Sequence, residues 1–150
     1  MKTCPHCGCS HDAQDRPRSV PQLRRYFAMI RAAYAHWPET ADVQFSSEEE
    51  CRKHVQMRAG WREVGARIPL VGVKPETAKM LAAAAIAGAK AHAWPVIHER
   101  ELIVWVPRSI KFASMGPQEF GQLSDAVAVV IKDMTGMDAE TLMKEHERAA

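Results

Sequence analysis

The strongest constraint on the fold of this 150-residue chain is a set of apolar residues at helical spacing between positions 20 and 37. Residues three or four positions apart lie on the same side of a helix, so this spacing predicts an amphipathic helix with one buried stripe. Pro21 suits the first turn of that helix, where no partner is needed for a backbone N–H. The stripe expected to be buried consists of Val20, Leu23, Phe27, Ile30, Tyr34 and Trp37.

The other face of the predicted helix is basic. Three arginines lie on it, two more come just before it, and no Asp or Glu occurs from residue 16 to residue 36. Such a face is either ordinary solvated surface or a surface that binds phosphate groups, and we expect the second. The predicted nucleic-acid-binding residues are Arg16, Arg18, Gln22, Arg24, Arg25 and Arg31.

Charge is distributed unevenly along a chain of ordinary composition, which is 47% hydrophobic and 25% charged. Residues 117–150 carry seven acidic and three basic side chains, a net charge of −4, which leaves +6 for the remainder of a chain whose total is +2. This polarity suggests an anionic partner for the first two-thirds of the chain, or a head-to-tail contact between subunits. No membrane span or signal peptide is recognisable, so we expect a cytoplasmic protein.

The first 17 residues form a cysteine-rich extension. Residues 4–8 read Cys-Pro-His-Cys-Gly, the spacing of a zinc knuckle, in which two thiolates face one ion. A structural zinc site needs four ligands, and the missing pair is either Cys9 with His11 or the more distant Cys51 with His54. The alternative is a tail whose cysteines bind no metal. We favour a structural Zn²⁺ held by the local set, Cys4, Cys7, Cys9 and His11.

The rest of the chain alternates between the two kinds of secondary structure. Further helices are expected at 47–59, 76–92, 117–134 and from 138 toward 150, and strands at 61–68, 94–97 and 102–106. The polar link at 98–101 favours an antiparallel hairpin, and the continuously apolar second strand is expected at the centre of the sheet. We therefore predict an α+β fold: one domain over 18–150, with four or five helices packed on a small three-stranded antiparallel sheet.

Catalytic motifs are missing from the sequence. It has no glycine-rich phosphate loop and no Gly-x-Ser-x-Gly elbow, and its seven histidines are scattered. A nuclease site requires clustered Asp, Glu or His side chains around a divalent ion, and no such cluster is recognisable. No catalytic residues are predicted, and we do not expect an enzyme.

Two stretches resemble known phage proteins. Arg18-Ser19-Val20-Pro21-Gln22 opens an aromatic-rich helix that ends at His36-Trp37-Pro38, and it resembles the Arg-Ser-x-x-Gln helix of the Orf/NinB recombination proteins of lambdoid phages. Residues 108–120 resemble the Lys-Ser-Ile-x-Phe-x-x-Met-x-x-x-x-Phe segment of a related family of small phage proteins. The similar regions span residues 18–37 and 108–134. Positions 21 and 23 hold Pro and Leu where Orf/NinB proteins have Asp and Asn.

The resemblance implies a function. Orf/NinB proteins are described as dimers that bind single-stranded DNA and assist phage recombination. The chain is thus expected to be a nucleic-acid-binding accessory protein of phage recombination or replication, and a homodimer. The uneven charge is equally consistent with a protein-interaction module, such as a counter-defence factor that binds a host protein. A metal-dependent nuclease is a third and less favoured hypothesis.

Overall fold

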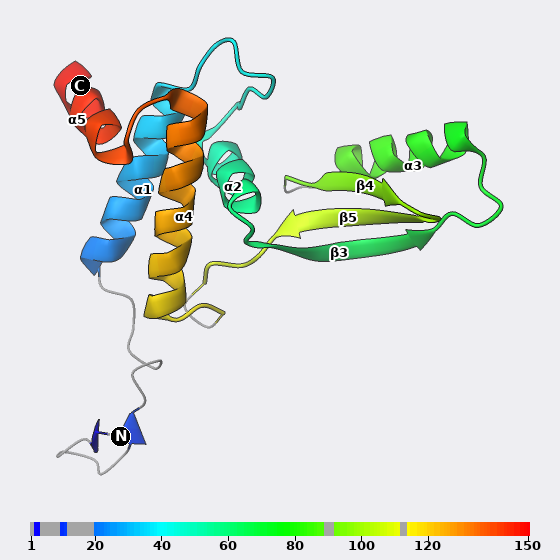
Figure 1. Cartoon of the computed structure of the whole chain (residues 1–150), viewed down its shortest axis with the longest axis horizontal. Coiled ribbons are helices and arrows are strands. Elements are labelled where there is room, and N and C mark those ends of the chain that lie inside the picture. The colour runs from blue at the N-terminus through cyan, green and yellow to red at the C-terminus, as the bar shows by residue number, and fades with distance from the viewer. Residues whose placement is uncertain (1, 4–9, 12–19, 89–91, 112–113) are drawn as a thin grey trace. The chain divides into compact units, whose positions relative to one another are not determined.

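The computed structural model describes residues 2–3, 10–11, 20–88, 92–111 and 114–150. Among these residues, five helices and a three-stranded antiparallel sheet confirm the predicted α+β fold (Figure 1). A short two-stranded hairpin precedes them. In chain order the elements are β1 (Lys2–Thr3), β2 (Ser10–His11), α1 (Val20–Ala35), α2 (Glu48–Arg58), β3 (Arg62–Pro69), α3 (Pro75–Gly88), β4 (Trp94–His98), β5 (Glu101–Pro107), α4 (Pro117–Thr135) and α5 (Ala139–Ala149).

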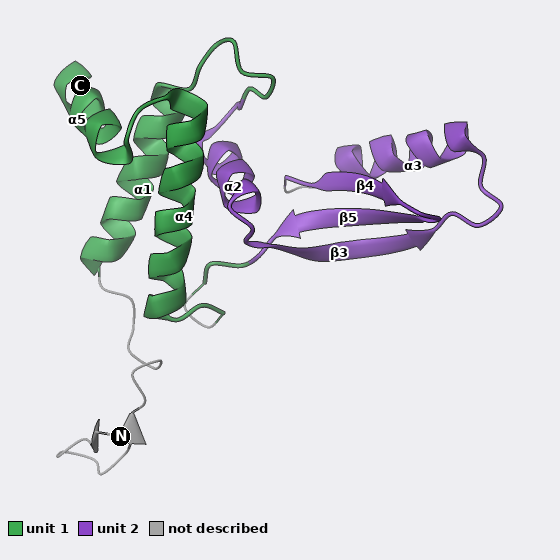
Figure 2. Ribbon diagram, viewed as in Figure 1, with its two compact units in different colours: residues 1–44, 109–150 green, residues 45–108 purple. Residues whose placement is uncertain are grey.

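The contacts within the chain divide it into two compact units (Figure 2). Unit 1 comprises residues 1–44 and 109–150, and unit 2 comprises residues 45–108. Unit 2 is therefore an insertion in the sequence of unit 1. The division has a physical reason, because the sheet and α3 bury their apolar side chains in a core of their own.

The helices of unit 1 are α1, α4 and α5, and α1 is in contact with both of the others. The fully buried Tyr26 of α1 meets Phe120 of α4 edge to face, with ring centroids 5.1 Å apart. α4, predicted over 117–134, ends at Thr135 and is followed by Gly136, whose φ of 75° is a conformation that favours glycine. The fully buried residues of the three helices include Tyr26, Phe120, Leu123, Val127, Ile131 and Leu142.

The buried side of α1 differs from the predicted one. Val20 and Phe27 were expected in the core, yet 58% and 41% of their surfaces are exposed. Helical spacing alone cannot choose between two neighbouring sides of a helix that both carry apolar residues. The side of α1 that carries Tyr26 is the buried one, because the ring of Phe120 in α4 packs on Tyr26. The buried residues of α1 are Tyr26, Met29, Ile30, Ala32 and Ala33.

The sheet of unit 2 has the order β3-β5-β4 with antiparallel neighbours, so β5 is central as its apolar sequence predicted. β4 and β5 form the expected hairpin. Leu102 of β5 lies opposite Ile68 of β3 and Ile97 of β4. Together with Val104 it packs against Ala78 of α3. α3 was expected to continue to residue 92, but its described part ends at Gly88, and residue 92 lies outside the helix.

Buried Gln56 connects α2 to the two chain segments that enter and leave the sheet. Its side-chain nitrogen donates hydrogen bonds to the carbonyl oxygens of Trp61, at 3.2 Å, and Arg108, at 2.6 Å. Trp61 directly precedes β3, and Arg108 directly follows β5. The predicted start of α2 is also confirmed, since the hydroxyl of Ser47 accepts a hydrogen bond from the N–H of Glu50.

Candidate nucleic-acid interface

One side of α1 combines exposed cations with an exposed aromatic ring. Arg24 and Arg31 are seven positions apart and therefore share a side of the helix. Phe27 lies between them, and Val20 extends the same side by one turn. We call these four residues the α1 stripe. Arg24 has no ion-pair or hydrogen-bond partner among the residues that the structure describes.

Two other predicted binding residues of α1 face neighbouring helices instead. Arg25 lies 3.1 Å from the carboxylate of Glu140 in α5. Both side chains are about two-thirds exposed, so this ion pair contributes little to stability. Gln22 is half-buried, and its amide nitrogen donates a hydrogen bond to the carbonyl oxygen of Pro117 at 3.2 Å. Although residues 16–36 contain no Asp or Glu, the basic face therefore meets a carboxylate of the C-terminal helix α5.

Several predicted site residues lie outside the described part of the chain. They are Cys4, Cys7, Cys9, Arg16 and Arg18. His11 belongs to β2, whose backbone pairs with β1. Among the described residues, no group of three or more His, Cys, Asp or Glu side chains is arranged to hold a metal ion. The proposed zinc site therefore remains a prediction from the sequence.

The alternative zinc ligands of α2, Cys51 and His54, are both buried. Burial raises the pKa of the Cys51 thiol to about 12, and the nearby charge of Glu48 adds to this effect. A thiol must lose its proton to bind zinc, and in the metal-free protein this environment favours the protonated form of Cys51.

His54 is instead paired with His92, a contact that the sequence did not predict. The Nδ1 of His54 lies 3.1 Å from the Nε2 of His92, and the indole nitrogen of Trp94 donates to the same Nε2 at 2.8 Å. Because the indole N–H is only a donor, this nitrogen of His92 is an acceptor and carries no proton. Burial, followed by the charges of His92 and Arg58, lowers the pKa of His54 to about 4. The two imidazoles therefore form a neutral, inward-facing pair.

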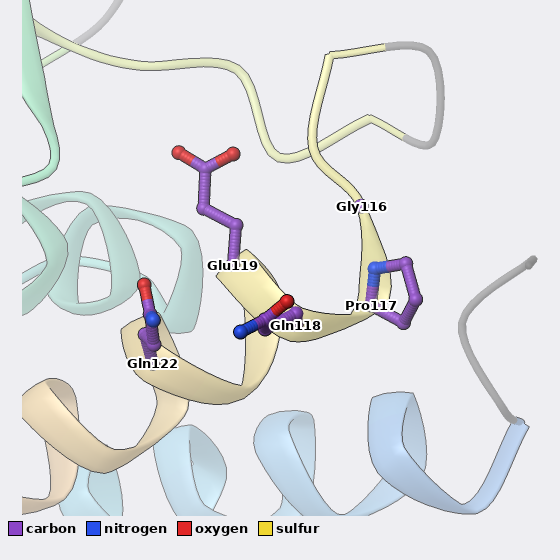
Figure 3. A pocket seen from close by; sticks show the side chains of 5 residues that line it. All are labelled: Gly116, Pro117, Gln118, Glu119 and Gln122. Atoms are coloured by element: carbon purple, nitrogen blue, oxygen red, sulfur yellow. The ribbon is translucent and has the colours of Figure 1, made fainter. Parts of the chain in front are cut away.

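Two pockets of unit 1 do not suit an anion. The first, of about 470 Å³, lies at the first turn of α4, where Glu119 is the charged side chain that lines it (Figure 3). Its other lining residues are Gly116, Pro117, Gln118 and Gln122. The second, of about 430 Å³, is lined by parts of α1 and α4 and contains both Arg25 and Asp125. The carboxylate in each pocket would repel a phosphate group.

Comparisons of the chain with protein-family models, with curated proteins and with solved structures find no match. The functional assignment therefore rests on the residues and their arrangement. Among the described residues, no helix has both the length and the apolar character needed to cross a membrane.

Proposed function

We propose that the protein binds single-stranded nucleic acid as an accessory factor of phage recombination or replication, and that the α1 stripe contacts the strand. The observation that carries this proposal is the exposed ring of Phe27 between Arg24 and Arg31. Proteins that bind single strands combine cations for the phosphates with aromatic rings on which bases stack. Residues 24 and 31 are about 10 Å apart along the helix axis, which leaves room for a base beside the ring.

Two features of the sequence support the same function. No acidic residue occurs from residue 16 to residue 36, so the charge of the segment before α1 adds to that of the stripe. The resemblance of residues 18–37 and 108–134 to Orf/NinB proteins also implies a single-strand-binding role.

A protein partner is the second candidate, and the exposure of Phe27 and Val20 favours it equally. Exposed apolar side chains rimmed by polar ones are typical of protein contact surfaces. A host protein bound there would be held by apolar burial and would show little dependence on salt. Phosphate contacts, in contrast, make affinity fall steeply as salt rises, because counterions are released on binding.

The test measures fluorescence anisotropy of a labelled oligo(dT) over a salt series. Replacing Arg24 and Arg31 together by Ala should weaken binding. It should also make the slope of log K against log salt less steep by roughly 1.4, which is about 0.7 for each lost phosphate contact. Phe27→Ala should weaken binding by about 5- to 150-fold without changing the slope, because base stacking is worth about 1–3 kcal/mol.

The matched control replaces Lys74 and Lys79 by Ala, which removes the same charge from exposed positions around α3 and should leave the slope unchanged. Phe27→Ala should lower the melting temperature less than Ile30→Ala in the core, which should cost about 2–5 kcal/mol. Equal slopes for wild type and the double arginine variant would remove α1 from the interface. Absence of any oligonucleotide binding would favour the protein partner.

A further inference from the structure

The sheet of unit 2 has one face that α3 covers and one that it does not. Alternate residues of a strand point to opposite faces. Leu102 and Val104 of β5 pack under α3, so Ile103 and Trp105 belong to the other face. The pairing register adds the residues opposite them. We call this side the indole face; it comprises Arg62, Val64 and Arg67 of β3, Trp94 and Val96 of β4, and Ile103 and Trp105 of β5.

The indole face is apolar and aromatic, and it is accessible over much of its area, although at one end the ring of Trp94 lies 5.5 Å from that of buried His54 in α2. Val64 is 36% exposed and Val96 is 44% exposed, while Trp94 and Trp105 are half-buried. Figure 1 shows α3 running along the sheet on one side only. An exposed apolar surface of this kind marks a binding site more often than ordinary protein surface does.

Arg62 is fixed on this face by the two indoles. Its guanidinium carbon lies 5.7 Å from the ring centroid of Trp94 and 5.2 Å from that of Trp105. Both distances are within the range of cation–π attraction. One terminal nitrogen also donates to the carbonyl oxygen of Met57 at 3.2 Å. No carboxylate among the described residues pairs with Arg62, whereas Arg67 of the same face is paired with Glu101 at 3.0 Å.

The positive charge of Arg62 indicates what kind of partner the indole face can bind. An apolar partner that covered the face would bury the Arg62 guanidinium without an anion, which is costly. Nucleic acid supplies both a phosphate for the guanidinium and flat bases for the two indoles and the arginine plane. Bases in a duplex are already stacked on one another, so only unpaired bases can lie on the sheet.

We propose that the indole face binds unpaired bases, with Trp94, Trp105 and Arg62 as its stacking platform. This inference rests on the proposed function, which provides the class of ligand, but it assigns a second and separate contact surface to unit 2. It also makes the protein selective for single strands over duplexes.

The closing experiment uses two neighbouring residues of β4 that lie on opposite faces of the sheet. Val96 and Ile97 are similarly exposed, at 44% and 50%. Val96→Glu places a carboxylate on the indole face, where it would repel phosphates, and Ile97→Glu places the same group on the α3 side. We expect Val96→Glu to lower the affinity for oligo(dT) by about tenfold or more and Ile97→Glu to change it by less than about twofold. Neither should alter binding to a duplex of equal length.

A second variant, in β3, tests the inference independently in case Val96→Glu disturbs the folding of β4. Arg62→Gln keeps a polar side chain on β3 while removing the charge and the guanidinium plane. It should weaken oligo(dT) binding several-fold and reduce the quenching of tryptophan emission on binding. Oligo(U) in place of oligo(dT) shows whether the face prefers RNA. An Arg62→Gln variant that binds and quenches like wild type would overturn the inference.

The outcomes separate this inference from the function on which it rests. If the wild-type protein binds no strand, both are wrong. If it binds, responds to the arginine substitutions in α1, and shows equal affinity for the Val96→Glu and Ile97→Glu variants, only the indole face is wrong. If Val96→Glu abolishes binding and the arginine substitutions leave it unchanged, the indole face is supported and the α1 stripe is wrong.

Discussion

At the scale of single residues, burial determines the chemistry of His54. The residue is 4% exposed, and its imidazole contacts the rings of His92, Trp94 and Phe45. Water is excluded from the ring, so the charged form loses its hydration and the neutral form is favoured. The carboxylate of Glu50 acts on His92 in the opposite direction, but burial prevails there as well and lowers the pKa of His92.

This pair predicts a loss of stability in mild acid. The unfolded chain protonates His54 near its ordinary pKa of 6.5, while the folded protein resists protonation until about pH 4. The free energy of unfolding should therefore be fully retained above pH 6.5 and fall as the pH drops toward 4. One pKa unit corresponds to about 1.36 kcal/mol, so the loss is at most about 3 kcal/mol. Urea denaturation at a series of pH values measures it.

Two histidine variants make the pH prediction specific. His54→Gln should reduce the difference in unfolding free energy between neutral and acidic solution, because the titrating group is gone. His98→Gln, at an exposed position of β4, should retain the difference. Identical pH profiles for His54→Gln and the wild-type protein would contradict the proposed role of burial.

At the scale of elements, β3 depends on a residue without a side chain. The register between β3 and β5 shifts between Val64 and Ala66, which places Gly65 at a bulge. A Cβ atom at Gly65 would lie 2.8 Å from the Cγ1 of Val106, closer than two carbon atoms can pack. The close approach of the two strands therefore requires glycine at this position.

Gly65→Ala is thus expected to destabilise unit 2 by about 1–3 kcal/mol, the usual cost of forcing an extra methyl group into a packed site. Gly88→Ala is the control, since a methyl group added there, at the end of α3, would have no atom of the described residues within 4 Å. That variant should be neutral or stabilising by about 0.4–1 kcal/mol. Thermal unfolding compares the two, and equal melting temperatures would argue against the tight packing at Gly65.

At the scale of the whole molecule, the proposed zinc site concerns the extension rather than the core of either unit. We predict that the full chain purified without chelator carries about one zinc ion, as a four-ligand structural site requires. Zinc should be released on acidification, because the thiolates become protonated. Elemental analysis measures the stoichiometry, and metal-free protein would contradict the prediction.

Two cysteine variants distinguish the ligand sets. Cys7→Ala should abolish zinc binding because Cys7 belongs to the knuckle. Cys51→Ala should retain it, because the Cys51 thiol is buried and protonated. Loss of zinc from the Cys51→Ala variant would instead support the remote ligand pair of Cys51 and His54.

The sequence by itself determined where the helices and strands lie. The hairpin of β4 and β5, the central position of β5, and the bounds of α4 to within one residue all follow from periodicity and turn residues. These features depend on local backbone geometry, which neighbouring residues specify. The exposed positions of Arg24 and Arg31 also follow from the helical pattern.

Only the tertiary structure decided which apolar residues are buried and which distant side chains meet. Tyr26 rather than Phe27 enters the core because α4 supplies a ring to receive it. His54 and His92 are 38 positions apart, so no local pattern could have paired them. Burial and long-range contacts depend on how elements pack, and elements with the same spacing of apolar residues can pack in more than one way.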